Sequence, residues 1–171
     1  AVGSPVVILE AGRTVLGAFL EARVIAVIGI GILLSIALRR GRDVALVFAP
    51  IMLAGLWTLA ATVLLDQAFN LANVIVLPLL FGLGVAGGIH LVARSRGGTL
   101  ASDALRTSTP RAVLFSALTT IGSFGCISLS EHPGTASMGV LLTLAVVMTL
   151  VATLIFLPAL LVLLDAEDHK E

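Results

Sequence analysis

The chain has 171 residues, of which 58% are hydrophobic and 12% charged, and its ten Lys and Arg balance its ten Asp and Glu. An average soluble domain is about 25% charged, and a disordered chain combines low hydrophobicity with high net charge, so this composition excludes both classes. Nucleic-acid binding needs clustered positive charge, and the zero net charge of this chain therefore argues against that function. The single cysteine, Cys126, excludes an internal disulfide framework and a multi-cysteine metal site. This is the composition of a membrane protein.

The N-terminal segment, residues 1–21, differs in pattern from the rest of the chain. Gly3, Ser4 and Pro5 predict a turn, residues 6–9 a short strand, and residues 11–22 an amphipathic helix. The sequence starts at Ala1 with neither a signal peptide nor a charged leader. We therefore interpret residues 1–21 as the exit of an upstream periplasmic domain and a lead-in helix.

Apolar stretches of membrane-spanning length fill the rest of the chain. A bilayer core about 30 Å thick needs roughly 20 residues at 1.5 Å rise. Five stretches qualify, the first only if the lead-in helix extends it: 24–38, 44–65, 69–93, 112–130 and 135–164. They lack the alternation of barrel strands. The prediction is an all-α, polytopic membrane helix bundle with five transmembrane helices in residues 22–171, and a short cytoplasmic surface helix near 99–108.

The distribution of cations predicts the orientation of these spans. Loops rich in Lys and Arg stay in the cytoplasm. Eight of the ten Lys and Arg lie after the first span, between the third and fourth spans, or at the C-terminus, whereas the loops around Asp66 and Glu131 hold none. We therefore expect the N-terminus to be periplasmic and the C-terminus cytoplasmic.

The spans hold almost no ionisable side chain. Intramembrane charges usually mark an ion or substrate path, and only His90 is a candidate, because histidine changes charge near neutral pH. His90 also lies four residues before Arg94, about 6 Å along a helix, and this position favours a place at the headgroup level over a relay role. No nucleophile with a neighbouring base and no metal-ligand cluster is evident. We expect no enzyme activity, cofactor or metal.

Small and hydroxylated side chains recur inside the spans. Gly84 and Gly88 have the GxxxG spacing that lets helices pack closely. Prolines at 50, 78 and 158 make kinks plausible. The hydroxyls of the fourth span, and those of Thr149 and Thr153, could bond to their own helix or to a neighbour. For all of these residues we favour a role in helix packing over a role in chemistry.

Five motifs carry a resemblance to a known family: NLAN at 70–73, LPLLFGLGV at 77–85, SALTT at 116–120, HPGT at 132–135 and FLPAL at 156–160. The chain resembles the resistance-nodulation-division (RND) permeases, of the MMPL-like kind, and within them the HpnN-type, hopanoid-transporting branch. The resemblance implies two halves, each with one span, a large periplasmic domain and five further spans. It places this chain as the last five spans of the second half.

The resemblance also exposes a departure. In many relatives the Gly-x-Gly-Val motif is followed by an aspartate that takes part in proton relay, and Ala86 stands at that position here. Alanine cannot carry a proton. If the transporter is proton-driven, the acid must come from the missing half, with His90, Thr119 and Thr120 as the relay candidates in this chain. Otherwise this half has a structural role and takes no part in proton coupling.

The function that the resemblance implies is the C-terminal membrane part of an inner-membrane exporter of hopanoids or related lipids. Its expected partners are membrane lipids, the hydrophobic substrate, the N-terminal half of the same transporter and a second copy in a homodimer, with no nucleic acid. The alternatives are an exporter of other lipids or drugs, and a non-transporting membrane scaffold.

Overall fold

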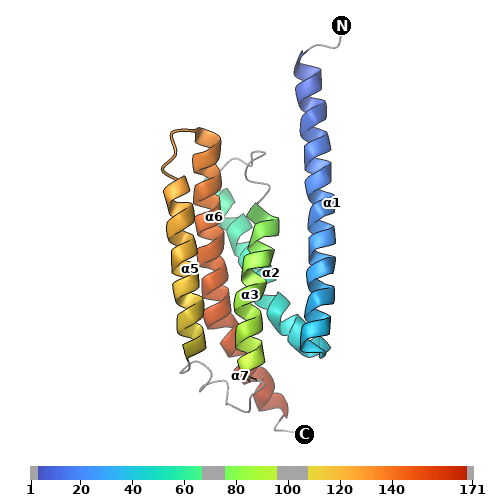
Figure 1. Ribbon diagram of the computed structural model, residues 1–171, viewed down its shortest axis with the longest axis vertical. Coiled ribbons are helices and arrows are strands. Elements are labelled where there is room, and N and C mark those ends of the chain that lie inside the picture. The colour runs from blue at the N-terminus through green and yellow to red at the C-terminus, as the bar shows by residue number, and fades with distance from the viewer. Residues whose placement is uncertain (1–3, 67–75, 96–107, 169–171) are drawn as a thin grey trace.

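The computed structural model describes residues 4–66, 76–95 and 108–168, and these residues are helical apart from short turns (Figure 1). The elements are α1 (Ser4–Leu38), α2 (Gly41–Leu64), α3 (Val76–Ser95), α5 (Ser108–Ile127), α6 (Pro133–Val151), a π-helical turn (Ala152–Phe156) and α7 (Leu157–Asp168). The predicted all-α membrane bundle is confirmed for this part of the chain.

Four helical stretches are long and apolar enough to cross a membrane: Gly41–Leu64, Pro78–Ser95, Ser108–Ile127 and Pro133–Leu164. The apolar stretch Val24–Leu38 is shorter and reaches only about 22 Å at 1.5 Å per residue. It belongs to the 35-residue α1, so a crossing there needs the preceding turns of the same helix.

The prediction of a turn and a short strand at the N-terminus is wrong, because α1 is already helical from Ser4. A strand must pair with another strand to satisfy its backbone groups, and the described residues contain none. A helix satisfies them within the segment, and Pro5 is compatible with a first helical turn. The predicted surface helix near 99–108 lies outside the described residues except for Ser108, which is the first residue of α5.

The helices from α1 to α6 alternate in direction, and the α1–α2 turn lies at the opposite end of the bundle from the α5–α6 turn (Figure 1). Arg39 and Arg40, in the α1–α2 turn, lie at the same end as Arg94 near the end of α3 and Arg111 near the start of α5. The α5–α6 turn lies at the opposite end. Arg39 and Asp66 close α1 and α2 with left-handed backbone, at φ 55° and 49°, the conformation in which many helices end.

The core joins α1, α2, α3, α6 and α7, and Leu34, Ile51, Leu80, Leu142 and Leu157 are among its buried side chains. In contrast, α5 has no buried residue. It packs along α6 and touches α3 only weakly. Large apolar side chains such as Ile25, Leu33 and Val63 are exposed, as expected for helices whose outer solvent is lipid.

Three glycine positions allow helices to approach closely. A Cβ at Gly84 would lie 3.0 Å from Ile51 Cγ1 on α2 and 3.1 Å from Thr149 Cγ2 on α6, and one at Gly88 would lie 3.0 Å from Val47 Cγ1. Gly139 on α6 is tighter, since its Cβ would overlap the backbone of Ile127 and Ser128 at the end of α5. The absence of a side chain at Gly139 therefore determines how closely α6 can approach the end of α5.

The last span contains a widened turn. The amide of Leu157 donates to the carbonyl of Ala152, five residues back, and residue 158 is a proline without an amide hydrogen. A proline ring collides with the carbonyl four residues earlier in an α-helix, and the π-turn relieves this conflict. Pro78 causes no such interruption because it lies in the first turn of α3.

Candidate functional site

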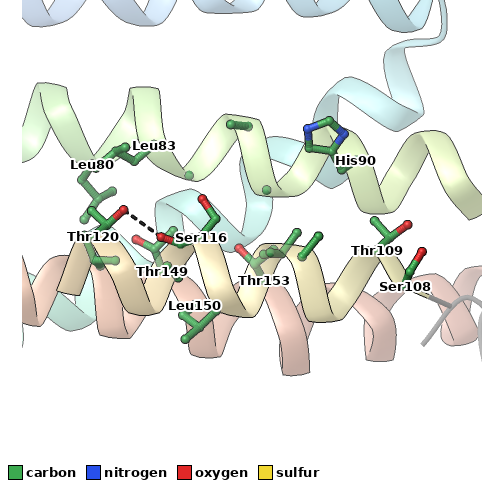
Figure 2. Close-up of a pocket in the computed structure, with 17 residues that line it drawn as sticks. Leu80, Leu83, His90, Ser108, Thr109, Ser116, Thr120, Thr149, Leu150 and Thr153 are labelled. Atoms are coloured by element: carbon green, nitrogen blue, oxygen red, sulfur yellow. Dashed lines mark hydrogen bonds between the residues drawn. The ribbon is translucent and has the colours of Figure 1, made fainter. Parts of the chain in front are cut away.

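A cavity of about 520 Å³ lies between α3, α5 and the α6–π segment (Figure 2). It exists because α5 packs closely on α6 while touching α3 only weakly, and because its walls are built from small side chains such as Ala86, Gly87, Ala112 and Ala117. A Cβ at Gly87 would lie 3.5 Å from both Val113 Cγ1 and Thr153 Cγ2. Gly87 thus marks where the three walls converge.

Polar groups line this cavity from several helices. Its hydroxyls belong to Ser108, Thr109, Ser116, Thr120, Thr149 and Thr153. Ser108 and Thr109 lie near His90 at one end of the cavity, and Thr120, Ser116 and Thr149 lie towards Leu80 at the other (Figure 2). Apart from these hydroxyls and the imidazole of His90, the lining is apolar, and the described residues contribute no Asp, Glu, Lys or Arg to it.

The structure brings together three of the positions singled out from the sequence. Ala86, His90 and Thr120 all line the cavity, whereas Thr119 does not. Both threonines donate to the same acceptor, the carbonyl oxygen of Ser116, at 2.8 Å from Thr119 Oγ1 and 2.9 Å from Thr120 Oγ1. Their side chains therefore differ in position relative to the cavity but not in hydrogen bonding.

The span hydroxyls bond mainly to their own helices. Thr58 Oγ1 donates to Ala54 O, Thr149 Oγ1 to Ala145 O and Ser123 Oγ to Thr119 O, at 2.7 Å, 2.7 Å and 2.9 Å. These contacts satisfy the hydroxyl hydrogens without joining helices. Among the cavity threonines, Thr120 and Thr149 therefore offer oxygen lone pairs to the cavity.

Sequence reasoning missed two features of this region. The first is the role of Thr149 and Thr153, which flank the start of the π-turn and line the cavity; their spacing of four and the nearby Pro158 were the available signals. The second is Asp43, which is only 9% exposed in the first turn of α2. A carboxylate there is favoured by the helix dipole, but no sequence pattern predicted its burial.

The arrangement holds no recognisable catalytic or metal-binding constellation within the described ranges. Among those residues, no three His, Cys, Asp or Glu side chains are grouped closely enough to hold a metal ion. The free thiol of Cys126 is exposed on α5 and does not line the cavity. The site offers hydrogen bonding, apolar contact and one ionisable side chain, the imidazole of His90.

Comparison with known proteins identifies close relatives. The chain is 48% identical over 161 residues to the hopanoid transporter HpnN of Rhodopseudomonas palustris and 44% identical over 161 residues to HpnN of Burkholderia multivorans, covering 94% of this chain and 18% of each relative. It is also 32% identical over 146 residues to a membrane protein of Methanocaldococcus jannaschii, covering 81% of this chain and 38% of that protein. No protein-family model matches the chain.

Proposed function

We propose that the chain, which belongs to the HpnN-type branch of the RND permeases, forms a membrane part of a transporter that moves hopanoids or related lipids out of the bacterial inner membrane. The observation that carries this proposal is the identity of 48% and 44%, sustained over 94% of the chain, to two proteins named hopanoid transporters. Because the chain spans 18% of those relatives, we place the rest of the transport machinery, including the N-terminal half, in the complete permease.

Cells that lack the complete permease are expected to retain hopanoids in the inner membrane. Hopanoids would be quantified in separated inner and outer membranes of three strains: the parent, the deletion strain, and the deletion strain carrying the permease gene. We expect the outer-membrane share to fall on deletion and to return on complementation. An unchanged distribution contradicts hopanoid export, and a changed distribution of another lipid or a drug would instead assign that substrate.

We further propose that proton coupling is supplied by the missing half. Ala86 cannot titrate, and of the described residues lining the cavity His90 is the one ionisable side chain. We propose His90, Thr119 and Thr120 as the groups of this chain that could assist the relay. In the complementation assay, His90→Phe is expected to lose export because the imidazole is removed. His90→Gln keeps a hydrogen-bonding group that carries no proton, so it loses export if proton transfer is the role of His90 and keeps export if hydrogen bonding is.

The proposed orientation puts the N-terminus in the periplasm and the C-terminus in the cytoplasm. It is supported by the gathering of Arg39, Arg40, Arg94 and Arg111 at one end of the bundle, because cationic loops stay cytoplasmic. The complete transporter is proposed to be a homodimer of the inner membrane, with membrane lipids around it.

Labelling of single cysteines tests this orientation. Arg111 and Glu131 are both exposed, at opposite ends of α5. In a Cys126→Ser background, an impermeant maleimide added to intact spheroplasts is expected to label Glu131→Cys, and to label Arg111→Cys only after the membrane is permeabilised. Equal labelling of the two positions from one side would contradict the five-span topology.

A further inference from the structure

The backbone hydrogen bonds of the last span are interrupted at the π-turn. The amide of Leu157 donates to the carbonyl of Ala152, so it does not serve the carbonyl of Thr153, its partner in a regular α-helix. The amide five residues after Thr153 would belong to residue 158, which is a proline without an N–H group. The carbonyl of Thr153 therefore receives neither of the two helical hydrogen bonds open to it.

A proline inside a helix does not by itself require a π-turn. Pro50 lies inside α2, and α2 remains α-helical from Gly41 to Leu64. The turn in the last span also falls at a buried position, since Thr153 is 2% exposed and a Cβ at Gly87 on α3 would lie 3.5 Å from its Cγ2. An unpaired backbone group costs free energy at such a place. Turns of this kind occur often at functional sites.

The two segments joined by the π-turn have different packing partners. On one side, α6 packs on α2, α3 and α5, and its buried side chains include Leu141, Leu142 and Ala145. On the other side, α7 leaves the line of α6 (Figure 1) and, among the described residues, packs mainly on α2. It buries Leu157 and Leu161. A change of angle at the π-turn would therefore move α7 and leave the contacts of α6 with α3 and α5 in place.

The length of the last span also favours a bend at the π-turn. The apolar stretch Pro133–Leu164 has 32 residues, about 48 Å at helical rise, whereas the hydrocarbon core is about 30 Å thick. The 19 residues of α6 already cover about 28 Å. A straight span would have to tilt or project from the bilayer. A bend after α6 lets α7 follow the membrane boundary instead.

We propose that residues 152–158 form a hinge at which α7 changes its angle to α6. Hinges in proteins are short segments at the ends of rigid elements that absorb such a change. The hinge itself follows from the hydrogen bonding and packing of the last span, whereas its use in lipid export rests on the proposed function. During transport, α7 moves against α2 while α6 stays with the rest of the bundle.

Distances between spin labels in the complete permease, held in nanodiscs, test the hinge. In a permease whose native cysteines are replaced by serine, Thr135→Cys and Leu163→Cys place labels at exposed positions on either side of it. Double electron–electron resonance then gives the distribution of the distance between them. The control pair, Ala45→Cys and Val63→Cys, is exposed on α2, which contains Pro50 but no π-turn. We expect the distribution across the hinge to be at least twice as wide as that across α2. Equal widths overturn the proposal.

Two substitutions at position 158 separate flexibility from packing. Pro158→Ala and Pro158→Gly both remove the ring and restore the amide, but alanine favours a rigid helix and glycine does not. We expect Pro158→Ala to narrow the distribution to the width found across α2 and to lower hopanoid export at least fivefold in the complementation assay. Pro158→Gly should keep the width and at least half of the export. Pro78→Ala is the control, because the first turn of α3 needs no amide there, and it should change neither quantity.

The remaining outcomes count against the hinge or against export separately. The same width and the same export in Pro158→Ala and Pro158→Gly contradict the hinge and assign the proline to packing. A narrowed distribution with normal export in Pro158→Ala contradicts a role of the hinge in transport. If the distribution behaves as expected but deletion of the permease leaves the hopanoid distribution unchanged, the hinge stands and hopanoid export falls.

Discussion

Replacing Gly139 by alanine is expected to destabilise the protein by about 3 kcal/mol, the upper end of the usual cost of overpacking. The added Cβ would lie 2.7 Å from the carbonyl carbon of Ile127 and 2.9 Å from Ser128 Cα, and closer still to the amide of Ser128. These are backbone atoms of the last turn of α5, where the Ser128 amide donates to Phe124 and Gly125. They cannot rotate away as a side chain can, so the α5–α6 hairpin must open.

The measurement is the free energy of unfolding in mixed detergent micelles. Gly122→Ala is the matched control, since a Cβ at Gly122 meets no atom within 4 Å and alanine is the better helix former by about 1 kcal/mol. We expect the control to be as stable as the original chain or more so. If Gly139→Ala has the same free energy of unfolding as Gly122→Ala, the close contact between α5 and α6 is not a feature of the folded protein.

Hydropathy predicted most of this fold because the bilayer imposes a strong constraint. A helix satisfies every backbone group in lipid, so long apolar stretches such as Gly41–Leu64 leave little choice of secondary structure. The N-terminal error has the opposite cause. Residues 6–9 are apolar but too few to distinguish a strand from a helix by periodicity. Their conformation depends on the residues around them, which belong to the same continuous helix, α1.

The candidate site was only partly predictable, for a geometric reason. Position 86 and His90 are one turn apart on α3, so sequence spacing alone puts them on one face. Which hydroxyls face them depends on how α5 is rotated about its own axis. That rotation separates Thr120 from the adjacent Thr119, and no local pattern encodes it. The π-turn likewise depends on a single proline in a long apolar stretch.

Replacing Gly84 by leucine is expected to lower the free energy of unfolding by about 3 kcal/mol or more. Gly84 lies where α2, α3 and α6 meet, and even an alanine Cβ there would be 3.0 Å from Ile51 Cγ1 and 3.1 Å from Thr149 Cγ2. Ile51 is fully buried and Thr149 is 9% exposed, so neither side chain can swing outwards. Alanine needs a shift of a few tenths of an ångström and is expected to cost about 1 kcal/mol, whereas leucine must separate the helices.

A series at two nearby positions distinguishes this contact from a general intolerance of large residues in α3. Gly82 is exposed, and a Cβ there meets nothing within 4 Å. Unfolding free energies in micelles should therefore fall in steps from Gly84 to alanine to leucine, and remain nearly level through the same substitutions at Gly82. A parallel loss of stability in the two series would contradict a specific contact between Gly84 and its neighbours on α2 and α6.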